Sequence, residues 1–232
     1  MRYLIACLVA VVAGCGGSSD IRESEHKPPP DARPGEGRYS GRLDAADVQR
    51  VITQHRAGFN NCLNQAEASY LSGDVFVEFA VDRSGRVENA GVVRSDLGSW
   101  KVEDCLIETA GFLAFPRPEG GKTRFAYTFP GPTVGKRLVR TVDPAWGYPT
   151  LRSARRPIND CRRRYQYEGP FHITAYVGPL GEVLDAGFDA KQAPPRELAA
   201  CVVGVVRGLR FPAGGREVTK YRALIENLDD DA

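Results

Sequence analysis

The sequence is poor in the residue types that most often carry catalysis. It contains three histidines (His26, His55 and His172), no C-x-x-C motif, and neither a Ser–His–Asp order nor a paired-carboxylate motif. Acid–base and nucleophilic chemistry draw mainly on such groups, so we expect a protein that is not an enzyme and that uses no cofactor. The formal net charge is only +2 over 232 residues. A near-neutral chain has no nucleic-acid footprint, and we expect no nucleic-acid partner.

Long hydrophobic runs are also scarce. The one at the N-terminus follows Arg2 and covers residues 3–13. It is too short to cross a hydrocarbon core of ~30 Å, which takes a helix of roughly 20 residues. A positive start followed by a short apolar run is typical of a signal peptide, which we place at residues 1–14.

The residues that end this run, Val12-Ala13-Gly14-Cys15, resemble a lipobox. The resemblance implies cleavage after Gly14 and acylation of Cys15, which would anchor the chain in a membrane. Each buried methylene adds about 0.8 kcal/mol, so several acyl chains hold firmly. Gly16 follows instead of an aspartate, which favours the outer membrane of the cell envelope, facing the periplasm. An ordinary secretory signal with an incidental cysteine is the alternative.

Residues 15–41 contain almost nothing apolar and include Lys27-Pro28-Pro29-Pro30. This composition cannot bury a core and predicts a disordered tether.

Four cysteines remain after Cys7 leaves with the signal peptide and Cys15 takes lipid. An even number in an exported chain predicts two disulfides, for which three pairings are possible. Metal binding is the alternative, but the histidines keep no common spacing to these cysteines, and we expect no metal site. The four are Cys62, Cys105, Cys161 and Cys201.

The rest of the sequence repeats itself at an offset of 96 residues. Cys105 then meets Cys201, and Phe115-Pro116 meets Phe211-Pro212. Turn glycines and alternating apolar residues also coincide, which indicates a duplication. The first cysteines, Cys62 and Cys161, lie 99 apart, so the second copy is three residues shorter there.

Each copy shows the same pattern of elements. A helix capped by Asp44 and apolar on one face is followed by two alternating strands, a second helix and a last strand. The predicted fold is therefore α+β, with two tandem helix–strand–strand–helix–strand units, each on a three-stranded antiparallel sheet. We place the units at residues 42–131 and 150–228, with a linker at 132–149 and an acidic tail at 229–232.

The repeat favours pairing within each copy, Cys62 with Cys105 and Cys161 with Cys201. In both copies the paired cysteines lie on the inner faces of the two helices. Closing loops of about 40 residues stabilises by roughly 4 kcal/mol in the chain-entropy model.

The first copy resembles the TonB C-terminal domain superfamily, and more closely the AgmX/PglI C-terminal domain family. The resemblance rests on Asn60-Asn61-Cys62, on Gly73-Asp74-Val75-Phe76-Val77, on Val81-Asp82-Arg83-Ser84-Gly85 and on Phe115-Pro116. The second copy is diverged. The resemblance implies a periplasmic module that binds an envelope protein by strand addition, with links to motility or transport machinery.

Two groups of residues are candidate partner-binding surfaces. The last strand of the first copy, residues 122–129, could be an open edge, or the second copy could cover it; its candidates are Lys122, Arg124, Phe125 and Tyr127. An arginine cluster could bind an acidic partner or phosphate groups, or be a solvated helix face. Its members are Arg155, Arg156, Arg162, Arg163 and Arg164. A cleft between the copies that binds a small ligand or an envelope polymer, or acts as a small hydrolase, is the alternative function.

Overall fold

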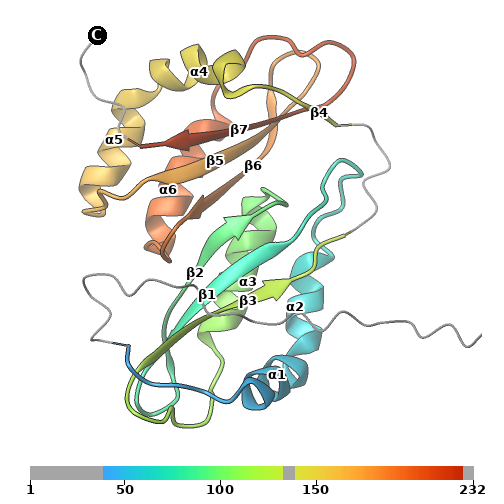
Figure 1. Cartoon of the computed structure of the whole chain (residues 1–232). Coiled ribbons are helices and arrows are strands. Elements are labelled where there is room, and N and C mark those ends of the chain that lie inside the picture. Colours follow the sequence, from blue (N-terminus) through green and yellow to red (C-terminus); the bar gives the residue numbers. More distant parts are fainter. Residues whose placement is uncertain (1–38, 133–138, 227–232) are drawn as a thin grey trace, which may run out of the picture. The chain divides into compact units, whose positions relative to one another are not determined.

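The computed structural model describes residues 39–132, here called the first half, and residues 139–226, the second half. Cys15, the predicted signal peptide, nearly all of the predicted tether and the acidic tail lie outside the described residues. Within the described ranges the chain forms six helices and seven strands in two sheets (Figure 1), which confirms the α+β prediction.

The first half contains three helices and a three-stranded antiparallel sheet of order β2-β1-β3. Strict alternation places every second residue of β1 against the helices, so Val75, Val77, Phe79 and Val81 are fully buried. The elements are α1 (Ala45–Gln54), α2 (Arg56–Leu63), β1 (Val75–Val81), β2 (Val87–Ser95), α3 (Trp100–Gly111) and β3 (Thr123–Phe129).

The first predicted helix is divided in two at His55. Asp44 caps α1 as predicted, its Oδ1 accepting from the N–H of Ala46 at 2.7 Å. His55 leaves helical geometry (φ −101°, ψ 11°), and its Nδ1 lies 3.0 Å from the carbonyl oxygen of Val51. The prediction of one continuous helix was therefore wrong, although α2 still brings Phe59 and Cys62 into the core.

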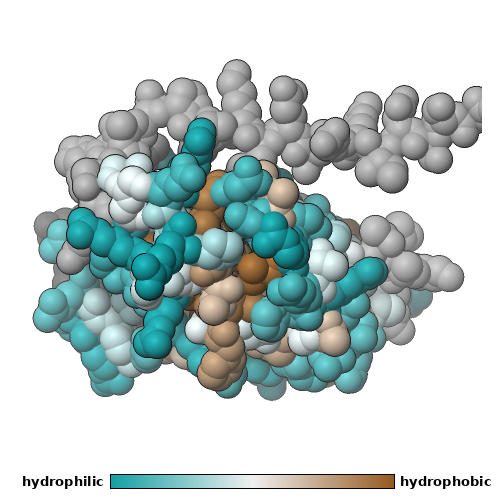
Figure 2. All heavy atoms as spheres, turned by 90° about the horizontal axis from the view of Figure 1, so that it is seen from below, coloured by the Kyte–Doolittle hydropathy of each residue, from teal (hydrophilic) through white to brown (hydrophobic). Residues whose placement is uncertain are grey.

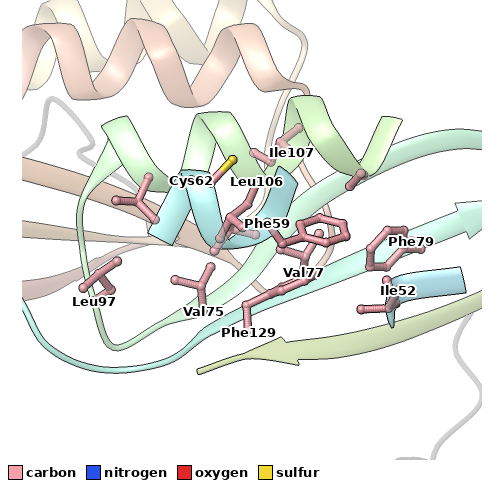
Figure 3. Close-up of a cluster of buried hydrophobic side chains, with 14 of the residues drawn as sticks. Ile52, Phe59, Cys62, Val75, Val77, Phe79, Leu97, Leu106, Ile107 and Phe129 are labelled. Atoms are coloured by element: carbon pink, nitrogen blue, oxygen red, sulfur yellow. The ribbon is translucent and has the colours of Figure 1, made fainter. Parts of the chain in front are cut away.

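The core of the first half lies between its helices and its sheet. Ile52, Phe59 and Leu106 from the helices meet Val77 and Phe129 from the strands (Figure 3). The rings of Phe59 and Phe129 are 4.5 Å apart at their centroids. The apolar stripe of each helix and one face of the sheet therefore form a single core.

The second half has the same order of helices and long strands, with one extra short strand. Its sheet is four-stranded and mixed, of order β4-β7-β5-β6, because β4 pairs in parallel with β7. The prediction of a three-stranded antiparallel sheet is therefore wrong for the second half, because β4 adds a fourth, parallel strand. The elements are β4 (Arg140–Thr141), α4 (Pro144–Ser153), α5 (Arg155–Arg164), β5 (Phe171–Val177), β6 (Val183–Ala190), α6 (Arg196–Arg207) and β7 (Thr219–Ile225).

The second unit begins earlier than the predicted boundary at residue 150. The predicted linker contains β4 and the start of α4, whose N-cap is Asp143, with Oδ1 accepting from the N–H of Ala145 at 2.8 Å. Asp143 lies 99 residues after Asp44, and Ala154, where α4 gives way to α5, lies 99 after His55. The offset that relates Cys62 to Cys161 thus extends to the start of both units.

Both predicted disulfides are formed, Cys62–Cys105 and Cys161–Cys201. Each joins the helix before the sheet to the helix between the second and last long strands. Disulfides form and persist in oxidising compartments, so the two bonds fit an extracytoplasmic protein. No helix in the described ranges is long and apolar enough to cross a membrane.

The two halves are in contact, and this changes the burial of the second sheet. In β5 the residues expected to face solvent, Thr174 and Tyr176, are as buried as their apolar neighbours. Helices α4 to α6 cover one face of this sheet, and residues 95–103 of the first half lie on the other, where Tyr176 donates to the carbonyl of Leu97 at 2.7 Å.

Candidate interaction site

β3 is an edge strand of the first sheet. It pairs with β1 on one side only, and no other strand of the described residues pairs with its second side. The main contacts of the second half with the first involve β2, α3 and the loop between them, with further contacts at Tyr70 and at Glu78 of β1. Among the described residues, β3 lies outside this main contact. The structure therefore does not support the alternative in which the second copy covers this strand.

The free edge can be assigned residue by residue. In an antiparallel sheet the N–H and C=O of one residue point to the same side, and the side alternates along the strand. The carbonyl of Lys122 accepts from the N–H of Gly41 at 2.7 Å and so points away from β1. Alternation then directs the backbone groups of Arg124, Ala126 and Thr128 outward as well.

The chain itself covers the beginning of this edge. Besides the Gly41 bond, Arg42 and Glu119 form a two-way backbone bridge, and the Arg124 guanidinium lies 4.3 Å from the ring centroid of Tyr39. The predicted tether therefore ends before residue 41, because Ser40 and Gly41 bond to residues 120 and 122. Beyond this point the outward groups of Arg124, Ala126 and Thr128 remain.

The predicted side chains of β3 divide between the two faces of the sheet. Phe125 stacks on Phe79, with centroids 5.1 Å apart, and Tyr127 donates to Gln49 at 3.2 Å, so both face the helices. Arg124 lies on the opposite face, 3.6 Å from Glu78. Lys122 forms an ion pair with Glu88. A partner strand on this edge would therefore meet Arg124 on one face and the margins of Phe125 and Tyr127 on the other.

The arginine cluster is not a single surface. Arg162 is only 7% exposed and donates to the carbonyls of Gly169 (2.9 Å) and Glu226 (2.6 Å), while its guanidinium lies 4.8 Å from the ring centroid of Phe171. This burial contradicts the prediction that Arg162 binds a partner, since it holds the end of β7 against α5. Arg163 is exposed and pairs with Asp160.

Arg156 and Arg164 are also exposed, and Arg155 is half-buried. The alternative of a solvated helix face therefore applies to the exposed members of the cluster, Arg156, Arg163 and Arg164.

A buried carboxyl that the sequence did not single out joins the halves. Glu103 on α3 is fully buried; its Oε1 accepts from Ser95 Oγ at 2.6 Å and its Oε2 from the N–H of Phe188 on β6 at 3.0 Å. Burial raises the pKa of Glu103 from 4.5 to about 8, outweighing both hydrogen bonds. The carboxyl supplies an acceptor for an edge amide of the second sheet.

Charged groups of the second half complete this contact. Arg222 donates to the carbonyl of Ser95 at 2.8 Å and pairs with Asp189, also at 2.8 Å. Asp189 Oδ2 lies 3.2 Å from His172 Nδ1. Ser99 donates to Asp185 at 2.7 Å, and burial raises the pKa of Asp185. Side chains therefore fill the space between the halves at this point.

An open groove of about 680 Å³ lies at the margin of the contact, lined by β2, the end of α3 and the start of α6. Its lining contains no serine, cysteine or histidine, so it offers a hydrolase no nucleophile of that kind. The face seen in Figure 2 is largely hydrophilic, with a hydrophobic patch near its centre. Sequence reasoning missed the groove because its walls come from both halves.

The described residues contain no group of three or more potential metal ligands close enough to hold an ion. In comparisons with known proteins, no family model, no curated protein and no solved structure matches this chain.

Proposed function

We propose that this chain is a non-catalytic lipoprotein of the cell envelope that binds an envelope protein by strand addition to β3. The observation that carries the proposal is the free edge of β3, where the backbone groups of three alternate residues, Arg124, Ala126 and Thr128, point outward. Added strands gain main-chain hydrogen bonds from such an edge and specificity from pockets for alternate side chains. The TonB and AgmX/PglI resemblance of the sequence supports the same mode of binding, and with it a role beside motility or transport machinery.

The anchor in this proposal is acylated Cys15, in the outer membrane facing the periplasm. The lipobox-like Val12-Ala13-Gly14-Cys15 supports it, and the two disulfides fit the compartment. We expect the Cys15→Ser variant to move from the membrane fraction to the soluble fraction and to lose the mass of the acyl chains. Wild-type chain without lipid on Cys15 would contradict the anchor.

Strand addition can be tested without disturbing the fold. Ala126→Pro removes one outward N–H, whereas the ladder to β1 uses the inward groups of Phe125 and Tyr127. Proline is tolerated on such edges because the lost donor faces solvent. With a photocrosslinking residue at Thr128, the wild-type chain should capture one defined envelope protein in intact cells, and Ala126→Pro should abolish that capture.

The matched control is Ala126→Val, which adds bulk but keeps the N–H. We expect Ala126→Val to retain the crosslink and both variants to keep the wild-type thermal transition. Equal capture by Ala126→Pro and the wild type would exclude strand addition at β3, and absence of any specific crosslink at Thr128 would exclude this edge as the binding site.

A further inference from the structure

The groove beside β2 has three walls that come together from both halves of the chain. One wall is the start of β2, with Val87 and Ala90; the second is the end of α3, with Ile107 and Phe112. The third is the segment from Ala193 to Glu197 that leads into α6. Phe112 is 80% exposed, so an apolar side chain stands open at the groove. An exposed aromatic beside a hollow is a typical anchor point for a partner.

Contacts between the halves hold the third wall in place. The N–H of Ala193 donates to Glu78 Oε1 at 3.2 Å, and its carbonyl accepts from Asn89 at 3.4 Å. Arg196 binds Asp104 through two nitrogens, at 2.5 and 2.9 Å. Bidentate arginine–carboxylate pairs fix both distance and orientation. The groove is therefore preformed, which lowers the entropic cost of filling it.

Ala90 of β2 lines the groove, although only 7% of the residue is exposed. The carbonyl of Ser95 accepts from Arg222 and points away from β1, so alternation along the paired residues also directs the backbone of Ala90 outward. The corresponding residues of β6 are already bonded: Phe188 N–H to Glu103, and Ala186 N–H to Asp185 at 2.8 Å. α3 packs on β6, whereas α6 makes no comparable contact with β2 among the described residues.

The charges around the groove favour a cationic occupant. Glu88, Glu108 and Glu197 line it, and Asp104 lies behind Arg196. Of these four acidic groups, Glu88 pairs with Lys122, and Asp104 and Glu108 both pair with Arg196. Two negative charges therefore remain unbalanced. The end of α3 adds the negative pole of its helix dipole on the same side.

We propose that this groove binds an extended peptide segment of a partner protein in which basic residues alternate with apolar ones. Its backbone pairs with the outward groups of Ala90, an apolar side chain packs on Phe112 and Ile107, and a basic side chain reaches Glu197. This site is separate from the β3 edge, and neither proposal requires the other.

The test uses the purified full-length chain and a fluorescein-labelled decapeptide of alternating lysine and valine. Fluorescence anisotropy should show saturable binding of this peptide and none of the version with glutamate in place of lysine. Phe112→Ser and Glu197→Lys should each weaken binding by about tenfold or more, since each removes one anchor. Hydrogen exchange of the Ala90 amide should slow when the peptide binds.

Two matched controls are available in the second half. Leu180 is 78% exposed, so Leu180→Ser removes a similar amount of exposed apolar surface away from the groove. Glu168→Lys changes the net charge as Glu197→Lys does, at another exposed position. Both controls should bind as the wild type, and so should Ala126→Pro, which separates this site from β3.

The proposal is overturned if the lysine peptide fails to saturate, if the glutamate peptide binds equally, or if Leu180→Ser and Glu168→Lys weaken binding as much as their groove counterparts. All groove variants change exposed side chains, so a wild-type thermal transition is expected for each.

Discussion

Glu103 shows how one buried carboxyl can make the stability of the chain depend on pH. Because its pKa rises from 4.5 to about 8 on folding, the folded protein keeps a proton that the unfolded chain releases over this pH range. The contribution of Glu103 to the free energy of unfolding should therefore be largest below about pH 4.5. It should fall as pH rises toward 8, by at most about 1.4 kcal/mol per pH unit.

The Glu103→Gln variant should remove this pH dependence while keeping an acceptor for the N–H of Phe188. Urea denaturation between pH 5 and 9 measures it. In the variant, the slope of the free energy of unfolding against pH should become shallower by up to about 1.4 kcal/mol per pH unit, which corresponds to one proton. An unchanged slope would show that Glu103 is ionised in the folded protein at neutral pH.

Arg162 is a second residue whose role follows from burial. Arg162→Met should keep the apolar contact with Phe171 but leave the carbonyls of Gly169 and Glu226 without their donor. A buried acceptor left without a donor costs about 1–3 kcal/mol. We therefore expect urea denaturation to show a free energy of unfolding lower by roughly 2–4 kcal/mol. Arg163→Ala, at an exposed position, should change stability by less than about 0.5 kcal/mol.

The sequence contained a signal for the burial of Arg162 that composition alone does not reveal. At the offset of 99 it corresponds to Leu63, a residue that packs against the core of the first half. An arginine at an inward position of a helix is a structural candidate, whereas Arg163 and Arg164 follow on the solvent side. Counting arginines around one helix could not make this distinction, because it ignores which face each residue occupies.

At the scale of elements, Asp44 and Asp143 cap the first helix of each half in the same manner. Each side chain accepts from the N–H two residues on, which satisfies a donor that the helix leaves open. Asp44→Ala and Asp143→Ala should each destabilise the chain by about 1 kcal/mol, and Asn at either position should restore most of it. Equal stability of the Ala and Asp proteins would mean that water replaces the cap.

Most long elements could be predicted from the sequence, and the exceptions have physical reasons. Alternation identified β1, β5, β3 and β7, and apolar spacing identified α3 and α6. β4 is two residues long and pairs through backbone alone, so it leaves no periodic pattern. The helix break at His55 has no glycine or proline beside it, whereas the break at Ala154 precedes Pro157, which cannot donate an N–H to the carbonyl of Ser153.

The candidate binding edge was predictable for the same reason that the fold was. The last strand of a unit pairs with the first strand on one side only, so its other side is an unpaired edge. The sequence predicted residues 122–129 to be this strand. What the sequence could not show is which backbone groups point outward or that the second half lies elsewhere. Both depend on register and on docking, which are set by contacts between residues far apart in the chain.

At the scale of the whole molecule, the contact between the halves depends on the close approach of two glycines. A Cβ on Gly187 would lie 2.5 Å from backbone atoms of Gly98 and 2.7 Å from Glu103. Gly187→Ala should therefore push the halves apart and destabilise the chain by roughly 1–3 kcal/mol in thermal or urea denaturation. Unchanged stability would mean that the two halves can separate at little cost.

Gly204 provides the control for this substitution. It lies inside α6, is exposed, and has no atom within 4 Å of the position of an added Cβ. Gly204→Ala should raise the free energy of unfolding by roughly 0.5–1 kcal/mol, since alanine is the better helix former.

The docking of the halves was the least predictable feature of the molecule. β5 alternates in sequence as a strand with one solvated face does, yet Thr174 and Tyr176 are buried beneath residues of the first half. Periodicity reports which residues share a face but not what covers that face. Serine, glutamate and arginine side chains, which sequence patterns assign to the surface, form much of the contact.

The bond between Gly41 and Lys122 also determines how the molecule would carry mechanical load. Gly41 directly follows the segment that leads from the N-terminus, and its N–H is bonded to the residue that begins the β3 edge. If the N-terminus is held at a membrane and a partner pulls on β3, tension passes from one attachment to the other through this bond and the Arg42–Glu119 bridge. The helices, the disulfides and the second half lie outside that path, so a pull loads the cores only after these backbone bonds break.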